Sequence, residues 1–263
     1  MLRCRSVSLC VEDDSALMTA AKPACAPPEL LTRRLTSFRP LSADDLQPLA
    51  RLAAEEQTHA AGSELVLAAS EARLVTAGLI VESRLLNDGR RQIVALRLPG
   101  DVLRGTHGAN HVVTATAASR TLDASAVVAE LEDAHRWPAA HRAWNAALGL
   151  EQRSVLDHVV RLGRFSAYER TAHLLLELHE RLLRVKLANA HGFQLPITQE
   201  ILADLLGLSI VHVNRTLQQL RRDGLLTYRA GAIGLPDPVR LADIAGYPLL
   251  FPTAAEPARR RAI

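Results

Sequence analysis

The sequence predicts an α+β fold in three parts: a β-rich N-terminal half, one long helix, and a C-terminal unit in which two short helices meet at a tight turn. Three observations support this prediction. Short β-branched runs occupy residues 60–128, and the period becomes helical after Trp137-Pro138. Close to the end, the stretch TQEILADLLGLSIVHVNRTLQQLRRDGLL (198–226) holds two amphipathic patterns separated by one glycine.

Length and composition set the broad class. A chain of 263 residues can form one large domain or two modest ones. Its 22% charged residues are ordinary for a globular protein, and its net charge of +3 permits a nucleic-acid partner without requiring one. No apolar run approaches the roughly 20 residues that span a bilayer, and acids from Glu12 to Asp14 interrupt any secretory signal. We therefore expect a cytoplasmic protein with no membrane partner.

The cysteines are confined to the N-terminal end. Cys4, Cys10 and Cys25 are an odd number, which argues against a disulfide framework, and their spacing matches no compact zinc motif. We predict reduced thiols in a disordered tail over residues 1–29, which ends in the proline-rich KPACAPPE; a redox or iron–sulfur role is the alternative. A second disordered, basic tail is expected over residues 248–263.

The region 30–135 predicts a short helical segment, up to residue 54, followed by a barrel or sandwich of strands. The strand-like runs are ELVLAA (64–69), RLVTAGLIVESRLL (73–86), RQIVALRL (91–98) and HVVTATA (111–117). Asn87-Asp88-Gly89 predicts a hairpin turn, since Asp-Gly tolerates the positive φ that such turns need. RQIVALRL alternates as a half-buried strand does, with Val94, Leu96 and Leu98 on one face.

Residues 136–164 form one long predicted helix with an apolar seam. The seam residues recur at offsets of three, four or seven, with Gln152 in the gap; they are Leu148, Val155, Val159 and Leu162. The seam predicts a dimerisation helix that pairs with the same helix of a second copy. Packing of this helix on the chain's own strands is the alternative.

Helix-boundary signals are strong in the C-terminal part. Ser166 and Glu169, three residues apart, form a capping box. Farther on, Thr198 and Ser209 are favoured N-cap residues, and Gly207 between them can adopt the left-handed conformation that ends a helix. The pattern predicts two short helices with an abrupt turn at Gly207.

These two helices have separate apolar and polar faces. The apolar positions are Leu202, Ala203, Leu205 and Leu206 in the first helix, and Val213, Leu217 and Leu220 in the second. Helix, glycine turn, helix at this spacing is a helix-turn-helix arrangement. Two short strands at 225–228 and 232–235 add a wing, so residues 165–247 predict a winged helix-turn-helix domain.

The outward face of the second helix carries side chains suited to DNA. Asparagine and arginine can make bidentate hydrogen bonds to adenine and guanine in the major groove, while threonine, serine and glutamine can contact phosphates. We predict a recognition helix over 209–222. The candidate DNA-contacting residues are Thr198, Gln199, Ser209, Ile210, Val211, His212, Asn214 and Arg215. A winged helix used for protein contacts is the alternative.

Three segments resemble the Crp–Fnr transcription regulators: LNDGRRQIVALRLPGD (86–101), LGRFSAYERTAHLLLELHERL (162–182) and LPITQEILADLLGLSIVHVNRTLQQLRRDGLL (195–226). The resemblance covers about residues 30–247. It implies a jelly-roll-like, cyclic-nucleotide-binding-type β-roll sensor domain over 30–135, the dimerisation helix over 136–164 and the winged DNA-binding domain over 165–247. It also implies a homodimer that binds double-stranded DNA at an inverted-repeat operator, with RNA polymerase as a further partner of an activator.

The sensor region departs from the nucleotide-binding members. Those members hold the ligand with a glutamate and an arginine after the PGD motif, whereas this chain has Gly105 and Val113 near these positions, and Arg104 in a different register. We expect no control by cyclic AMP. Oxygen-sensing members use four cysteines, one of them in the β-roll, and this β-roll has none. His107 and His111 are interpreted as loop histidines, so no haem, iron–sulfur cluster or metal is predicted, and the effector is left open.

The recognition helix also departs from many members, which carry charged residues directly after the capping serine. Ile210 and Val211 occupy those positions here, and apolar side chains can meet a thymine methyl group. The family's best-known operator sequence is therefore not assumed for this chain.

Other function classes find less support in the sequence. No nucleophile elbow, P-loop, paired-cysteine zinc site or dinucleotide fingerprint is present, so we do not expect an enzyme. The alternative to a regulator is a ligand-binding or protein-docking module whose β-roll remains but which no longer binds DNA specifically.

Overall fold

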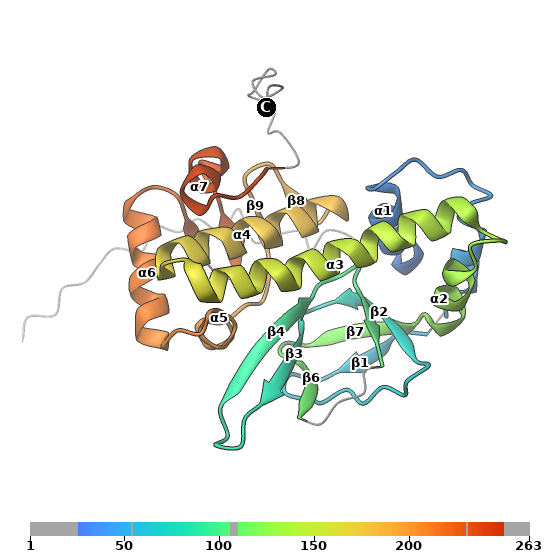
Figure 1. Cartoon of the computed structure of the whole chain (residues 1–263), viewed down its shortest axis with the longest axis horizontal. Coiled ribbons are helices and arrows are strands. Elements are labelled where there is room, and N and C mark those ends of the chain that lie inside the picture. Colours follow the sequence, from blue (N-terminus) through green and yellow to red (C-terminus); the bar gives the residue numbers. More distant parts are fainter. Residues whose placement is uncertain (1–25, 54, 106–109, 230, 250–263) are drawn as a thin grey trace, which may run out of the picture.

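The long helix α3 (Pro138–Arg164) organises the molecule. Figure 1 shows it crossing the structure, with the strands of residues 57–123 below it and the helices of residues 167–245 gathered around its C-terminal end. The structure is a computed structural model that describes residues 26–53, 55–105, 110–229 and 231–249. The predicted α+β fold is confirmed, with its β-sheet domain, long helix and C-terminal helix-turn-helix domain.

The N-terminal part is a roll of two antiparallel sheets, with strand orders β1-β7-β2-β5 and β4-β3-β6. Its elements are helix α1 (Pro27–Thr36), the 3₁₀ helix η2 (Gln47–Arg51), strands β1 (Gln57–His59), β2 (Ala72–Ala77), β3 (Ile80–Leu85), β4 (Arg91–Arg97), β5 (Val102–Arg104), β6 (His111–Ala115) and β7 (Ser119–Asp123), and helix α2 (Ser125–Glu132). The predicted hairpin at 87–89 joins β3 to β4, and Gly89 has the expected positive φ of 82°.

Helix α1 begins earlier than the predicted domain boundary at Leu30. Its first residues are Pro27 and Pro28, which lie in the segment predicted to be part of the tail. Proline is favourable in the first turn of a helix, because its fixed φ is helical and its missing N–H has no intrahelical partner there. At the other end, Leu249 packs against the core, two residues past the predicted boundary at Tyr247. The remaining residues of both predicted tails, with all three cysteines, lie outside the described residues.

The prediction of a strand over 64–69 is wrong. The chain makes a single isolated bridge there, between Glu64 and Thr114, and Val66 is 91% exposed. Leu65 is buried in the roll, where its N–H donates to the carbonyl oxygen of Val113 at 2.9 Å, and the partly buried Leu67 packs against the same apolar cluster. The apolar character of the run therefore reflects two leucines that contact the roll from an irregular segment, and the strand that precedes β2 is β1, which pairs with β7.

The predicted alternation in β4 is interrupted by a bulge. The register of β3 with β4 passes from Glu82 opposite Ala95 to Ser83 opposite Ile93, which leaves Val94 without a paired residue. An extra residue reverses the facing of the side chains beyond it. As a result Ile93 is buried together with Leu96, whereas the sequence pattern had placed them on opposite faces.

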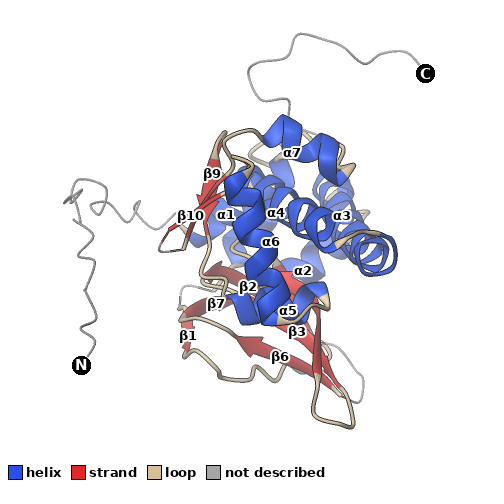
Figure 2. Cartoon of the chain, turned by 90° about the vertical axis from the view of Figure 1, so that its left-hand side faces the viewer, coloured by secondary structure: helices blue, strands red, loops and turns tan. Residues whose placement is uncertain are grey.

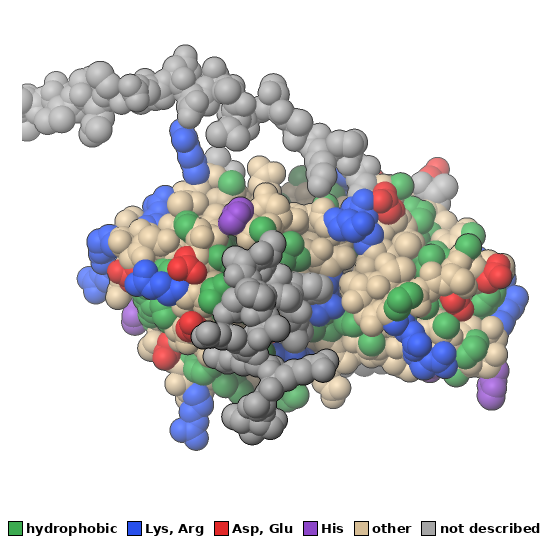
Figure 3. All heavy atoms as spheres, turned by 90° about the horizontal axis from the view of Figure 1, so that it is seen from above, with side chains coloured by type: hydrophobic (Ala, Val, Ile, Leu, Met, Phe, Trp, Pro, Cys, Tyr) green, Lys and Arg blue, Asp and Glu red, His purple; other side chains and the backbone are tan. Residues whose placement is uncertain are grey.

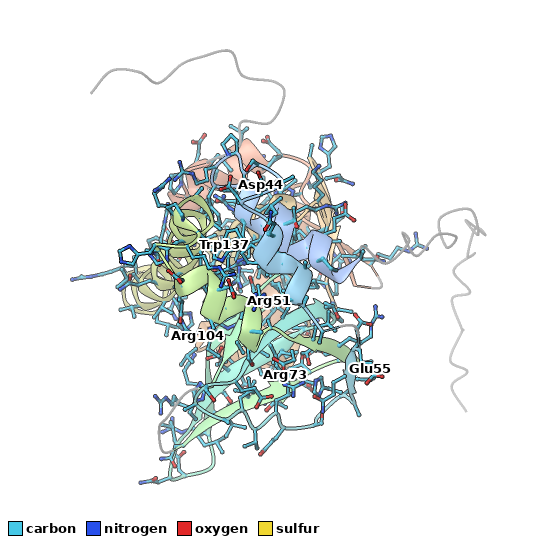
Figure 4. All side chains as sticks on the ribbon, turned by 90° about the vertical axis from the view of Figure 1, so that its right-hand side faces the viewer. Asp44, Arg51, Glu55, Arg73, Arg104 and Trp137 are labelled. Carbon is cyan, nitrogen blue, oxygen red and sulfur yellow. The ribbon has the colours of Figure 1, made fainter. Side chains whose placement is uncertain are left out.

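Helix α4 (Ala167–Arg184) starts directly after α3 and packs alongside it. The predicted capping box at Ser166 is confirmed: its hydroxyl accepts from the Glu169 N–H at 3.3 Å, and a Glu169 carboxylate oxygen accepts from the Ser166 N–H at 2.7 Å. The other end of α3 is held by Glu130 of α2, which pairs with Arg51 at 2.9 Å and accepts from the Trp137 indole N–H at 2.5 Å. Arg51 and Trp137 are labelled in Figure 4.

The apolar seam predicted on α3 is only partly correct. Leu148 packs against the core beside α1 and α2, and Leu162 lies against the turn at Gly207. The two valines of the seam are exposed, Val155 by 48% and Val159 by 62%. The apolar residues exposed on the second half of α3 are Val155, Leu156, Val159 and Val160. Leu148 and Leu162 are thus partly buried against other elements of the chain, and the solvent-facing stripe of α3 contains two residues that the seam had omitted, Leu156 and Val160.

The C-terminal part contains the predicted helices and wing together with elements that the sequence did not indicate. Its elements after α4 are β8 (Ala188–Asn189), β9 (Gly192–Gln194), α5 (Gln199–Leu206), α6 (Ile210–Arg222), β10 (Thr227–Arg229), β11 (Ala232–Gly234) and α7 (Pro238–Ala245). The wing strands β10 and β11 join a sheet of order β10-β11-β9-β8. Strands β8 and β9 are too short to show a period of two, so they were missed.

One apolar cluster joins the roll to the C-terminal part. It contains Leu79, Val81, Ile93, Leu96 and Leu98 of the roll together with buried residues of α4, α5 and α6. A shared core of this kind holds the helix-turn-helix against the roll, instead of leaving the two as units on a linker.

A buried group of charges lies along the same junction. Asp101, 1% exposed, accepts hydrogen bonds from Arg181 of α4 at 2.5 Å and from the Leu98 N–H at 2.8 Å, and it pairs with Arg34 of α1. Burial alone would raise the pKa of the Asp101 carboxyl, but the nearby guanidinium groups lower it to about 2. The ionised Asp101 carboxylate therefore links helix α1, helix α4 and the segment that follows β4.

Candidate nucleic-acid interface

The first helix of the candidate interface is bounded as the sequence predicts. The Thr198 hydroxyl accepts from the Ile201 N–H at 3.2 Å and caps α5. At the other end, Gly207 adopts the left-handed conformation, with φ 62° and ψ 38°. Any other residue at this position would bear the steric cost of that conformation. The turn is therefore specified locally.

Helix α6 is set against α5 and α4 by its inner face. The Ser209 hydroxyl accepts from the His212 N–H at 3.2 Å, which confirms the predicted N-cap. The three predicted inner residues are all buried: Val213, Leu217 and Leu220. Thr216 is buried as well, and its hydroxyl donates to the His212 carbonyl one turn earlier at 2.9 Å. The opposite face of the helix is left to solvent.

The structure brings the predicted residues of α6 together on one exposed surface. Ser209, Ile210, Val211, His212, Asn214 and Arg215 are all exposed. Figure 2 shows α6 at the end of the molecule that faces the viewer, with α5 beside it. The remaining two candidates begin the preceding helix: Thr198 is exposed and Gln199, the first residue of α5, is half-buried.

The charged residues of α6 are all basic. Between residues 209 and 222 the chain contains Arg215, Arg221 and Arg222 and no aspartate or glutamate. Arg221 donates to the carbonyl oxygen of Tyr228 in β10 at 2.6 Å and so supports the wing. Arg215 and Arg222 form no ion pair with any residue that the structure describes. Figure 3 shows Lys and Arg side chains projecting at this end of the molecule, on the left of the view.

Asp223, the acidic residue that directly follows α6 in the sequence, forms a hydrogen bond within the chain. Its carboxylate accepts from the Tyr168 hydroxyl of α4 at 2.6 Å. Burial, the hydrogen bond and the negative charge of Asp223 raise the pKa of Tyr168 to about 12, so this hydroxyl keeps its proton. The bond fixes the end of α6 to α4.

Two shallow hollows lie side by side on the exposed face. One, of about 380 Å³, is lined by Val211, Asn214, Arg215, Gln218 and Arg222. The other, of about 370 Å³, is lined by Ser209, Val211, His212, Arg215, Thr216 and Gln219. Val211 and Arg215 border both, so they form the ridge between them. Gln218 and Arg222 were not among the candidate residues, although their spacing of three and seven residues from Arg215 places them on the same stripe.

In the β-roll, the two positions that the sequence singled out lack the polar groups of a nucleotide site. Val113 is buried in an apolar cluster with Val75, Ile80 and Leu103. A Cβ atom at Gly105 would lie 1.8 Å from the Ala68 carbonyl oxygen, so the backbone leaves no room for a longer side chain. These positions therefore offer no carboxylate and no guanidinium group to a phosphosugar.

The two histidines that the sequence singled out are not brought together at a metal site in the described part of the chain. His107 lies outside the described residues. The interpretation of His111 as a loop residue is wrong: it is the first residue of β6 and pairs with Arg84 of β3, and its Nε2 atom lies 3.2 Å from a carboxylate oxygen of Glu82. The part of the chain that the structure describes contains no group of three or more His, Cys, Asp or Glu residues placed to hold a metal ion.

A β-roll joined by a long helix to a winged helix-turn-helix defines a class of proteins in which a sensor-type domain is combined with a DNA-binding domain. The comparisons with known proteins agree. Residues 169–244 match the family model of the Crp-like helix-turn-helix domain.

Characterised regulators match over a longer span. The chain is 37% identical over 172 residues to the nitrogen fixation regulation protein FixK of Bradyrhizobium diazoefficiens, covering 65% of this chain and 72% of that protein. It is 30% identical over 179 residues to the transcriptional activator protein FnrL of Cereibacter sphaeroides, covering 65% and 71%.

Solved structures share the fold. The structure of FixK2 from Bradyrhizobium japonicum superposes with a TM-score of 0.59 at 32% identity, covering 73% of this chain and 98% of that one. TTHB099 of Thermus thermophilus, at 22% identity and a TM-score of 0.53 over 72% of this chain and 96% of that one, shares the fold alone.

The chain belongs to the Crp–Fnr family of transcription regulators. It is a DNA-binding regulator of that type, as the sequence predicted, and the relatives named above are transcription regulators rather than enzymes. Among the described residues, no helix is long and apolar enough to cross a membrane.

Proposed function

We propose that this chain acts as a homodimer that inserts α6 into the major groove of an inverted-repeat operator. The single observation that carries the proposal is the exposed face of α6, where Asn214 and Arg215 lie side by side on a stripe without acidic residues. DNA attracts such a surface electrostatically, and the arginine and the amide provide groups that distinguish bases.

Each candidate residue has a role that its chemistry supports. Arg215, with its forked donors, reaches guanine O6 and N7, and Asn214 reaches adenine N6 and N7. Thr198 and Gln199 contact phosphates from the start of α5, because helix N-termini favour anions. Ser209 and His212 lie in the first turn of α6 and contact the backbone beside the groove. Ile210 and Val211 contribute apolar surface.

The second copy in the proposal covers the exposed stripe on α3. Val155, Leu156, Val159 and Val160 are each between 46% and 62% exposed. Four neighbouring apolar side chains on one helical stripe are better buried against a partner than hydrated. Pairing of the same stripe from two copies gives two-fold symmetry, and two α6 helices then meet half-sites about 10 base pairs apart, or a multiple of one helical turn.

We propose that cyclic AMP does not control the protein. If the chain is an activator, as the FnrL relative is by name, it also contacts RNA polymerase. The proposed place of action is the cytoplasm, where the DNA is.

The test uses the full chain and an operator recovered by in-vitro selection from random-sequence DNA. Binding of Arg215→Ala and Gln199→Ala is titrated on the operator and on scrambled DNA at one fixed salt concentration. Arg215→Ala should weaken operator binding by about 1–3 kcal/mol and relax sequence choice, whereas Gln199→Ala should weaken both DNAs about equally. If Arg215→Ala binds both DNAs as the unmodified protein does, α6 is not the recognition helix.

A further inference from the structure

Val211 is an exposed apolar residue on the face of α6 that is proposed to bind DNA. It is 62% exposed, on the first turn of α6, and every other residue that lines the two hollows beside it is polar or charged. An apolar side chain placed against the polar edge of a base pair removes water from hydrogen-bonding groups without replacing it, which is unfavourable. In the major groove, thymine is the base that presents a methyl group instead.

We propose that Val211 recognises the 5-methyl group of a thymine next to the guanine that Arg215 contacts. This inference rests on the proposed insertion of α6 into the major groove and adds the identity of a second base. The protein thereby recognises half-sites in which a guanine and a thymine are close together.

The positions of the two side chains support this pairing. Val211 and Arg215 are four residues apart on α6 and border the same two hollows. Four residues of helix advance by about 6 Å, and successive base pairs are about 3.4 Å apart. The thymine is therefore expected within two base pairs of the guanine.

The neighbouring apolar residue does not share this position. Ile210 is 47% exposed, yet it lines neither of the two hollows on the α6 face. It is displaced around the helix from the ridge that Val211 and Arg215 form. Ile210 is thus a matched control: an exposed, branched apolar residue on the same turn, without the proposed contact.

The chemistry of the stripe excludes another common mode of recognition. Carboxylates accept a hydrogen bond from the cytosine N4 amino group, and residues 209–222 contain no carboxylate. Replacing Val211 with glutamate would introduce that acceptor beside Arg215. The Val211→Glu variant should therefore lose its preference for thymine and gain one for cytosine at the same position.

The experiment removes single methyl groups from the DNA. Each thymine of one half-site of the selected operator is replaced in turn by uracil, which lacks only the 5-methyl group, and binding of the full-length protein is titrated at fixed salt. One uracil position, within two base pairs of the essential guanine, should weaken binding about fourfold, the ratio expected for burial of one methyl group. Val211→Ala should bind the thymine and uracil probes alike, and Ile210→Ala should keep the fourfold difference.

The outcomes separate this inference from the proposed function. If Arg215→Ala relaxes sequence choice but no uracil substitution within two base pairs of the guanine matters, or the selected half-site has no thymine there, Val211 does not recognise a methyl group although α6 enters the groove. If Val211→Ala retains the thymine preference, another residue provides the contact and the inference is overturned. If Arg215→Ala changes nothing, the proposed function itself is wrong.

Discussion

Arg91 of β4 reaches across to Asp204 of α5 and donates to the same carboxylate oxygen through Nε at 2.9 Å and Nη2 at 2.5 Å. Beside it, the Gln92 amide donates to the carbonyl oxygen of Asp204 at 2.7 Å. That carbonyl lies in the last turn of α5, where backbone acceptors lack helical partners. The β3–β4 hairpin of the roll therefore binds the first helix of the helix-turn-helix directly.

A double-mutant cycle should measure this contact. Both side chains are about a third exposed, at 33% and 34%, so water screens the pair. We expect Arg91→Ala and Asp204→Ala to be coupled by about 0.2–1 kcal/mol in urea unfolding, and less at high salt. Arg90→Ala is the matched control, because Arg90 pairs with Asp88 of its own turn. Equal coupling for Arg90 and Asp204 would contradict a specific contact.

The α3 stripe predicts how the dimer can be broken. Val155→Asp with Val159→Asp places two charges in the proposed interface, and both positions are exposed, so the fold of one chain should tolerate them. In light scattering, the mass should fall from that of a dimer to that of a single 28.6 kDa chain, and operator affinity should fall with it. Val66→Asp, at a valine 91% exposed on the roll, should leave the mass unchanged. An intact dimer in the double variant would rule out this interface.

Cyclic nucleotides should leave the protein unaffected. The phosphate of such a ligand needs a cation and hydrogen-bond donors when it is buried, and Val113 and Gly105 provide neither. Calorimetry with cyclic AMP and cyclic GMP should give no binding heat at micromolar concentrations, and operator titrations should coincide with and without them. Micromolar affinity together with stronger operator binding would show that the prediction is wrong.

Asp101 predicts a pH-dependent contribution to stability. Its pKa in the folded chain is about 2, below the ordinary value near 4. A lowered pKa means that the ionised carboxylate stabilises the fold fully above about pH 4–5, and that this contribution is lost as the pH falls toward 2. Asp101→Asn should cost about 3–5 kcal/mol at pH 7, because it leaves the buried Arg34 and Arg181 without their charge partner.

Urea unfolding at two pH values tests this contribution. The difference in the free energy of unfolding between the unmodified protein and Asp101→Asn should be smaller by about 1 kcal/mol at pH 3 than at pH 7. At pH 3 the Asp101 carboxyl is largely protonated in the unfolded chain, so part of the stabilisation is already lost. Asp44→Asn, at an exposed aspartate, should change stability by less than about 0.5 kcal/mol at either pH. A constant difference between pH 7 and pH 3 would mean that Asp101 carries no special charge interaction.

The sequence by itself determined the features that depend on residues close together in the chain. The caps at Ser166, Thr198 and Ser209 and the left-handed turn at Gly207 were predicted correctly, because each involves bonds within about four residues. The inner and outer faces of α6 were predicted for the same reason, since a helical period specifies them over thirteen residues. Most of the candidate site lies on α6, and Thr198 and Gln199 lie at the start of α5.

Only the tertiary structure decided the features that need a distant partner. The bulge at Val94 appears when β4 pairs with β3, and strands β8 and β9 are recognisable only from their pairing with each other and from the pairing of β9 with β11. Whether a residue of α3 packs against the chain, as the partly buried Leu148 does, or is exposed, as Val159 is, depends on which elements lie around the helix. The Arg91–Asp204 contact joins residues more than one hundred positions apart, and nothing in either local sequence specifies the other, so folding alone brings them together.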